Sequence, residues 1–207
     1  MHVIDGNYQL RLLPPSLPPT YGGLSQSILH AVGAYPSTRV DIVFDTYEQP
    51  WIKDCEQERC GAEDVRYTIT GPDQIHPKDL NKALKSTSFK SQLPRFLLKD
   101  WGDQHHAHAL RDKEVYIGVD DVCARFAVEG GQIHKSIVSE LCSNHPEGDT
   151  RICQHLMHIN ESRLSDNDNV VIRASDADIR VILLHHVHET TLGVWMEVGT
   201  SGRGDTR

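Results

Sequence analysis

Several short hydrophobic runs of this 207-residue chain end in an aspartate. Three runs end in this way, at residues 2–5, 40–45 and 170–178, and a further acidic pair, Glu147 and Asp149, follows Pro146. Carboxylates that share one site are stable only if cations neutralise them or if some of them take up protons. Carboxylate oxygens are also the ligands that hard divalent cations prefer. The pattern therefore predicts a site for Mg²⁺ or Mn²⁺, provided that the fold brings the ends of these runs together.

Short apolar runs alternate with segments of helical periodicity, which is typical of an α/β protein with a mainly parallel central sheet flanked by helices. We expect strands at residues 2–5, 40–44, 65–69, 133–138, 170–174 and 191–198, a hairpin formed by 114–119 and 123–128, a proline-rich loop at 12–19, and helices at 21–34, 47–59, 77–85, 89–101, 146–162 and 177–184. Parallel strands place their carboxyl ends along one edge of a sheet, so the acids would converge there. The length fits a single domain, residues 1–198, followed by a glycine-rich tail, residues 199–207.

Each acid also has a simpler structural explanation. Asp5, Asp45 and Asp176 stand where N-caps of the following segments are expected. Glu147 and Asp149 stand where a helix dipole favours negative charge. Several such positions on one sheet edge nevertheless favour a shared site, because ligands bind at that edge in open α/β sheets. Two divalent ions about 4 Å apart in such a site activate water and stabilise the leaving oxygen during phosphodiester hydrolysis.

Four short blocks carry a resemblance to a known family. In order along the chain, Ile4-Asp5-Gly6, Val43-Phe44-Asp45 with Lys53, Glu56 and Arg59, Glu147-Gly148-Asp149 and Ser175-Asp176-Ala177-Asp178 resemble the acidic motifs of flap-endonuclease and XPG-type nucleases of the PIN-like superfamily. The blocks are also similar to those of uncharacterised animal proteins, some of them tied to mobile elements. The resemblance implies a three-layer, Rossmann-like PIN fold.

The resemblance also assigns roles to individual residues. It implies a site for two Mg²⁺ or Mn²⁺ ions, and the acids that match metal ligands are Asp5, Asp45, Glu147, Asp149, Asp176 and Asp178. Lys53 and Arg59 match basic residues that approach the scissile phosphate, where their charge would stabilise the transition state. From the residues alone, Lys53 and Arg59 fit equally a solvated helix face that pairs with Glu56 and Glu58.

Two departures from the family pattern bear on activity. The resembled proteins have a further acid in a Gly-Cys-Asp-type block, followed by a DNA-binding helical region. This chain contains neither of them before Arg207, so we expect its C-terminal part to be missing. They usually have alanine where this chain has Gly148, which weakens the helix start. Two functions follow: a metal-dependent endo- or exonuclease acting on DNA rather than RNA, or a catalytically inactive PIN-like binding or structural module, such as a mobile-element relic.

The bulk composition limits the partners and the compartment. A net charge of −8 argues against a broad surface for nucleic acid, although basic residues can still cluster locally. The five cysteines are odd in number and form no C-x-x-C pair, and no signal peptide or membrane-length apolar run is recognisable. We therefore expect an intracellular protein, nuclear or cytoplasmic, with free thiols and no membrane contact.

Two histidine tracts provide a separate hypothesis. His105-His106-Ala107-His108 and His185-His186-Val187-His188 could bind Zn²⁺ if the tracts met in the fold, because imidazole suits borderline metals. No pair of cysteines at zinc-finger spacing accompanies them. The alternative is that these histidines are exposed polar residues.

Overall fold

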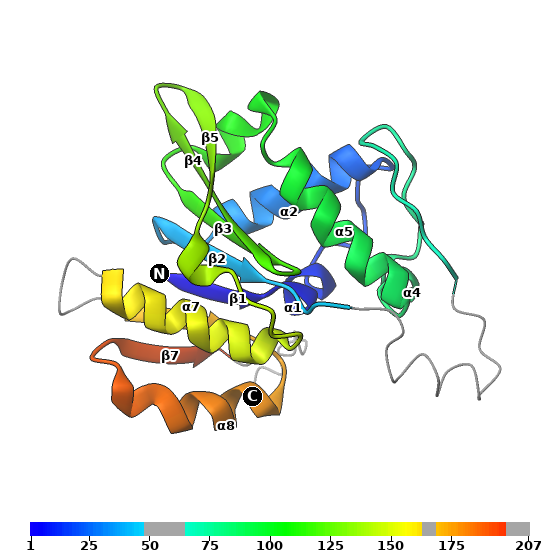
Figure 1. Cartoon of the computed structure of the whole chain (residues 1–207). Helices are drawn as coiled ribbons and strands as arrows, with labels where there is room; N and C mark the ends of the chain where they lie inside the picture. The colour runs from blue at the N-terminus through cyan, green and yellow to red at the C-terminus, as the bar shows by residue number, and fades with distance from the viewer. Residues whose placement is uncertain (48–64, 163–168, 198–207) are drawn as a thin grey trace, which may run out of the picture.

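A single sheet organises the chain (Figure 1). The structure is a computed structural model that describes residues 1–47, 65–162 and 169–197. The strands in these ranges are β1 (His2–Asp5), β2 (Arg39–Val43), β3 (Glu114–Val119), β4 (Val122–Glu129), β5 (Gln132–Ile137), β6 (Asn169–Arg173) and β7 (Gly193–Glu197). Their order across the sheet is β5-β4-β3-β2-β1-β6-β7.

The centre of the sheet is parallel and one margin is antiparallel. Strands β3, β2, β1, β6 and β7 run parallel to one another. Strand β4 pairs with β3 in the antiparallel direction, and β5 pairs with β4 in the same way. Every residue of β2 is buried, as expected for a parallel strand covered on both faces. The tight turn from β3 to β4 uses Asp120, whose φ of 51° lies in the left-handed region that aspartate tolerates. The predicted hairpin around Asp120-Asp121 is thereby confirmed.

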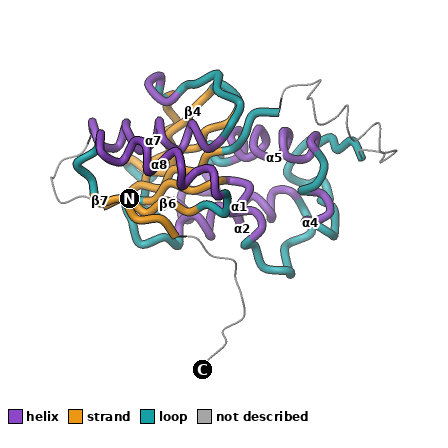
Figure 2. Tube along the Cα trace, turned by 90° about the horizontal axis from the view of Figure 1, so that it is seen from below, coloured by secondary structure: helices purple, strands orange, loops and turns teal. Residues whose placement is uncertain are grey.

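Helices cover both faces of the sheet (Figures 1 and 2). The α-helices in the described ranges are α1 (Gly6–Arg11), α2 (Tyr21–Gly33), α4 (Leu80–Ala83), α5 (Thr87–Asp100), α6 (Ala107–Leu110), α7 (Gly148–Ser162) and α8 (Ala177–His186), with 3₁₀ turns η1 (Gln104–His106), η2 (Ser139–Leu141) and η3 (Val187–Glu189). None of these helices has both the length and the apolar character needed to cross a membrane.

The two faces form separate hydrophobic cores. Adjacent residues of β1 divide between them: Ile4 packs with α2 and α5, whereas Val3 packs with α7 and α8. This division follows from the alternation of side chains along a strand. The result is a three-layer α/β arrangement, which confirms the predicted mainly parallel central sheet flanked by helices and is consistent with a Rossmann-like fold.

Two predicted elements differ in the structure. Residues 65–69 are not a strand, because their backbone amides bond to α5 instead of to a sheet: Tyr67 N donates to Ser88 Oγ (2.9 Å) and Ile69 N to Gln92 Oε1 (2.8 Å). The helix expected at residues 77–85 shortens to Leu80–Ala83, which begins after its N-cap, Asp79. The helix expected at residues 47–59 falls almost entirely outside the described residues.

Candidate functional site

The carboxyl ends of the central strands open into an acidic pocket of about 350 Å³. Its lining includes five of the six predicted metal-binding acids, and these are Asp5, Asp45, Glu147, Asp149 and Asp176. The acids come from four parts of the chain: the end of β1, the segment after β2, the start of α7 and the start of α8. We refer to this group of residues as the acidic pocket.

Asp5 connects β1 to α1. It is the last residue of β1 and the N-cap of α1, and its Oδ1 accepts hydrogen bonds from Asn7 N (2.9 Å) and Tyr8 N (3.3 Å). Burial, followed by the charge of Asp45, raises the pKa of Asp5 to about 6, against the opposing effect of the two amides. The expected capping role of Asp5 is therefore real, and it coexists with a position in the acidic pocket.

Asp45 is the most firmly oriented carboxylate in the pocket. Its Oδ2 accepts from Asn7 Nδ2 (2.9 Å) and Tyr47 Oη (3.0 Å), and its Oδ1 accepts from Gly148 N (2.8 Å). A Cβ at position 148 would lie 2.7 Å from Asp45 Oδ1. Glycine at this position therefore allows the carboxylate to bond to the first amide of α7, which an alanine would obstruct.

Asp149 lies in the first turn of α7 and takes the largest influence from the other acids. Burial, then the charges of Asp176, Asp45, Asp5 and Glu147, raise the pKa of Asp149 to about 7. Burial and the negative charge of the neighbouring acids together favour the protonated form of Asp149. Without a cation, the acidic pocket reduces its repulsion by keeping protons on part of its carboxyl groups.

The two aspartates at the start of α8 differ in position. Asp176 is the N-cap, its Oδ1 accepts from Asp178 N (2.9 Å), and its side chain lines the acidic pocket. Asp178 is exposed and is not among the described residues that line the pocket. Of the predicted metal ligands, Asp178 is therefore the one that the structure does not bring to the others.

The basic residues beside the acids were not found from the sequence. Lys53 and Arg59 lie outside the described residues. Instead, Arg11 from α1, Lys85 and Lys90 line the acidic pocket, with Lys90 Nζ 4.5 Å from the centre of the Tyr47 ring. Arg11 is the last residue of α1, the short helix that Asp5 caps, so its spacing from Asp5 was a usable signal. Lys85 lies just before α5 and Lys90 within it, and no pattern in the sequence indicated how this part of the chain packs.

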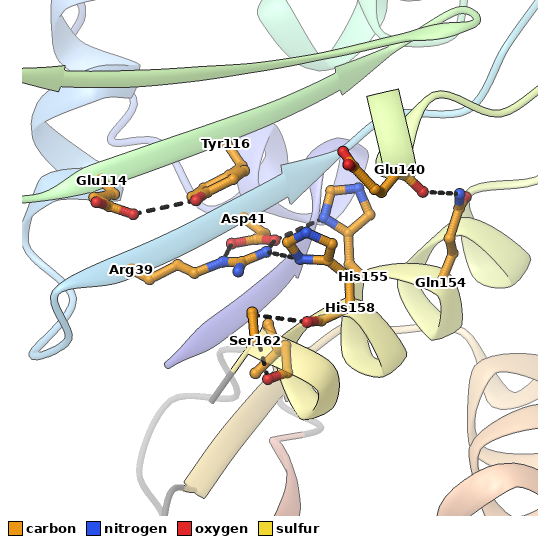
Figure 3. Close-up of polar contacts among 10 residues, drawn as sticks. Arg39, Asp41, Glu114, Tyr116, Glu140, Gln154, His155, His158 and Ser162 are labelled. Atoms are coloured by element: carbon orange, nitrogen blue, oxygen red, sulfur yellow. Dashed lines mark hydrogen bonds and ion pairs between the residues drawn. The ribbon is translucent and has the colours of Figure 1, made fainter. Parts of the chain in front are cut away.

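Helix α7 is fixed against β2 by buried polar contacts (Figure 3). Asp41 of β2 accepts from Arg39 Nε (2.8 Å) and Nη2 (2.7 Å), and from His155 Nδ1 of α7 (2.7 Å). Although burial alone raises the pKa of Asp41, the hydrogen bonds and charges of Arg39 and His155 hold it below its ordinary value. This ion network sets the position of the helix that carries Asp149.

Arg151 makes a second connection between α7 and the end of β2. Its guanidinium is fully buried, and Nη1 donates to Phe44 O (3.2 Å) and Thr46 Oγ1 (3.3 Å), on either side of Asp45. No role was predicted for Arg151 from the sequence, although it lies two residues after Asp149. The structure gives it a positioning role for Asp45.

The acidic pocket has the donor chemistry of a magnesium site. Mg²⁺ usually takes one or two carboxylates and completes its octahedron with water or substrate oxygens. Within the described residues, no three of the pocket carboxylates offer oxygens that all lie within 4.8 Å of one another. The arrangement therefore fits hydrated ions that each take one or two protein ligands, rather than a closed all-protein cage.

The histidine tracts do not meet within the described part of the chain. His105 and His106 instead form a group with Asp100, whose ligand atoms all lie within 4.8 Å of one another. His108 and the second tract are not part of that group, and His186 pairs with Glu189 (3.0 Å). The two tracts therefore do not come together as one metal-binding group among the described residues.

Comparison with known proteins adds no assignment. No family model matches the chain, and neither does any curated protein or solved structure.

Proposed function

We propose that this chain is a metal-dependent nuclease-like domain of the PIN-like superfamily, of flap-endonuclease and XPG type. It would hydrolyse phosphodiester bonds of nucleic acid, DNA rather than RNA, with two Mg²⁺ or Mn²⁺ ions. The observation that carries the proposal is the convergence of Asp5, Asp45, Glu147, Asp149 and Asp176 on one pocket at the carboxyl edge of the sheet.

The charge of the pocket supports divalent cations over a purely structural role. Separate helix caps have no reason to lie close enough to raise one another's pKa, yet the carboxylates near Asp149 contribute to raising its pKa to about 7. Divalent cations would relieve this repulsion, and their binding would release the protons that the pocket otherwise retains. When bound, the ions supply Lewis-acid stabilisation of phosphate oxygens and activation of water.

The residues around the carboxylates have two further roles, which are to hold a carboxylate in place and to attract a phosphate. Asn7, Tyr47 and Gly148 hold the Asp45 carboxylate in place through their hydrogen bonds. Arg11, Lys85 and Lys90 border the same pocket and present positive charge to a phosphate backbone. A polyanion can therefore approach an acidic site because cations of the protein lie beside it.

Asparagine substitutions test the proposal with little damage to the fold. Asp176→Asn retains a good N-cap for α8 but removes the negative charge, and Asp45→Asn keeps an oxygen acceptor. We expect Mn²⁺-dependent cleavage of flap, single-stranded or duplex DNA to fall by at least about 100-fold in either variant, since even the partners of metal ligands typically account for 10- to 100-fold. The matched control is Asp178→Asn, which removes an exposed acid two residues from Asp176 and should leave the rate near that of the wild type.

The alternative function, a catalytically inactive PIN-like module, predicts a different result. Such a protein would bind DNA or be stabilised by Mn²⁺ without cutting any of the three substrates. If the purified protein neither cleaves nor gains thermal stability with Mn²⁺ or Mg²⁺, the metal site itself is disproved.

A further inference from the structure

We propose that Asp100, His105 and His106 form a second metal site, selective for Zn²⁺ and distinct from the acidic pocket. The three residues surround the junction between the end of α5 and the turn η1. Their ligand atoms all lie within 4.8 Å of one another, and this is the one such group within the described residues. Two imidazoles and a carboxylate are a donor set that suits zinc, and they differ from the all-carboxylate acidic pocket.

The separations are close to those of a zinc centre. Ligands about 2.0–2.1 Å from a tetrahedral zinc ion lie roughly 3.3 Å from one another. His106 Nε2 and Asp100 Oδ2 are already 2.8 Å apart, and the rings of His105 and His106 have centroids separated by 3.7 Å. The ligand atom of His105 lies within 4.8 Å of those of His106 and Asp100, so a small shift of this exposed side chain would complete the set without a rearrangement of the core.

His105 is held in the tautomer that a metal requires. Its Nδ1 lies 2.8 Å from Asp103 Oδ1, and the backbone amide of His105 donates to the same oxygen at 3.1 Å. An ionised carboxylate can only accept, so Nδ1 carries the proton and Nε2 retains the lone pair. A carboxylate paired with the far nitrogen of a ligating histidine is the usual support of a zinc ligand.

His106 is held beside Asp100. Its side chain is fully buried and its Nε2 lies 2.8 Å from Asp100 Oδ2, so an ion bound there would replace the proton shared by these two atoms. A buried histidine fixed by one carboxylate has little rotational freedom and presents a preorganised ligand. His105 and Asp103 leave the opposite side open to solvent, which gives an ion a route of entry.

The surrounding structure suggests what the ion would do. Gln104, which lies between Asp103 and His105 in the sequence, forms two hydrogen bonds with the backbone of Ile133 in β5. Its Nε2 donates to the Ile133 carbonyl (3.2 Å), and its Oε1 accepts from the Ile133 amide (2.8 Å). Zinc at this junction would therefore tie the end of α5 to the antiparallel β4–β5 extension. Zinc bound there would stabilise the folded chain, because the unfolded chain does not hold the three ligands together.

Zinc binding to the full chain tests the proposal. We would titrate Zn²⁺ against a chromophoric chelator in the presence of excess Mg²⁺, which does not compete for imidazole ligands. The wild type should bind one Zn²⁺ at this site and melt at a higher temperature with it. His105→Ala should weaken binding by at least about 100-fold, and Asp103→Asn by about 10-fold, as expected for a ligand and for its support.

Matched variants separate this site from other zinc binding. His108→Ala removes an exposed histidine of the same tract, His185→Ala removes one from the second tract, and neither should change the affinity. Asp176→Asn should retain the zinc, because it alters only the acidic pocket. The proposal is overturned if the wild type binds no Zn²⁺, if His105→Ala binds as the wild type does, or if His108→Ala loses as much affinity. Loss of cleavage by the acidic pocket would not affect any of these outcomes.

Discussion

At the scale of single residues, Asp149 shows how the acidic pocket affects the stability of the protein. Its pKa of about 7 in the folded chain exceeds the value of about 3.9 expected for an unfolded chain. At pH values between these two pKa values, the folded state therefore binds more protons than the unfolded state. The resulting contribution to stability is complete below about pH 4 and is lost as the pH rises through 7.

The prediction is that Asp149→Asn removes this pH dependence in metal-free protein. At pH 8 the variant should be more stable than the wild type by roughly 1–2 kcal/mol, a value reduced for solvent screening of a partly exposed group. At pH 4 the difference should be small, because Asp149 is then protonated in the folded state. The free energy of unfolding from urea titrations with a chelator present measures both values.

An exposed acid outside the acidic pocket provides the control for this prediction. Asp73→Asn removes a carboxylate from the turn after residue 71 and should not alter the pH dependence. A difference between Asp149→Asn and wild type that stays constant from pH 4 to pH 8 would contradict the raised pKa.

At the scale of elements, the start of α7 determines how the acidic pocket is assembled. Gly148 opens this helix, and its amide donates to Asp45 at 2.8 Å. Alanine favours a helix interior over glycine by up to about 1 kcal/mol. The added Cβ, however, would lie 2.7 Å from Asp45 Oδ1. Asn7 and Tyr47 bond to Oδ2 of the same carboxylate and hold it in place.

We expect the steric effect to exceed the gain in helix propensity. Gly148→Ala should lower the free energy of unfolding by about 1–2 kcal/mol, in the range typical of overpacking, and should weaken Mn²⁺ binding by displacing Asp45. Gly71→Ala is the matched control, because a Cβ there would contact nothing within 4 Å. Denaturant unfolding and Mn²⁺ titration measure the two effects. An alanine variant that is more stable and binds Mn²⁺ normally would show that Asp45 moves aside freely.

The elements also show what the sequence could predict. The strand that ends in Asp5 and the strand that precedes Asp176 were predictable because both are short apolar runs, and the convergence of their ends follows from parallel pairing. Residues 65–69 alternate like a strand, but side chains of α5 satisfy their backbone amides, and a local pattern cannot reveal such a partner. Arg151 was missed for a related reason, since its contacts around Asp45 arise only when α7 packs on β2.

At the scale of the whole molecule, charge presents an apparent conflict with the proposed substrate. The chain has a net charge of −8, and a polyanion would be repelled by it at long range. Screening limits that repulsion to about 8 Å at physiological salt, so local charge determines contact. Arg11, Lys85 and Lys90 supply positive charge at the border of the acidic pocket.

Salt dependence can reveal whether these lysines touch phosphates. In an Asp176→Asn background, which prevents cleavage, we expect Lys85→Ala with Lys90→Ala to weaken DNA binding. The slope of log affinity against log salt should fall in magnitude by roughly 1.4–1.8, which is about 0.7–0.9 for each of the two phosphates that the protein no longer neutralises. Fluorescence anisotropy over a range of salt concentrations measures the slope.

The control must remove the same net charge elsewhere. Lys78→Ala with Lys99→Ala takes two exposed lysines from other parts of the surface, and Lys99 belongs to the same helix as Lys90, at its opposite end. Because both double variants become more negative by the same amount, a general charge effect would lower their affinities alike. Equal slopes in the two would therefore assign DNA binding to overall electrostatics, whereas a smaller slope in the first alone would locate the nucleic acid at the acidic pocket.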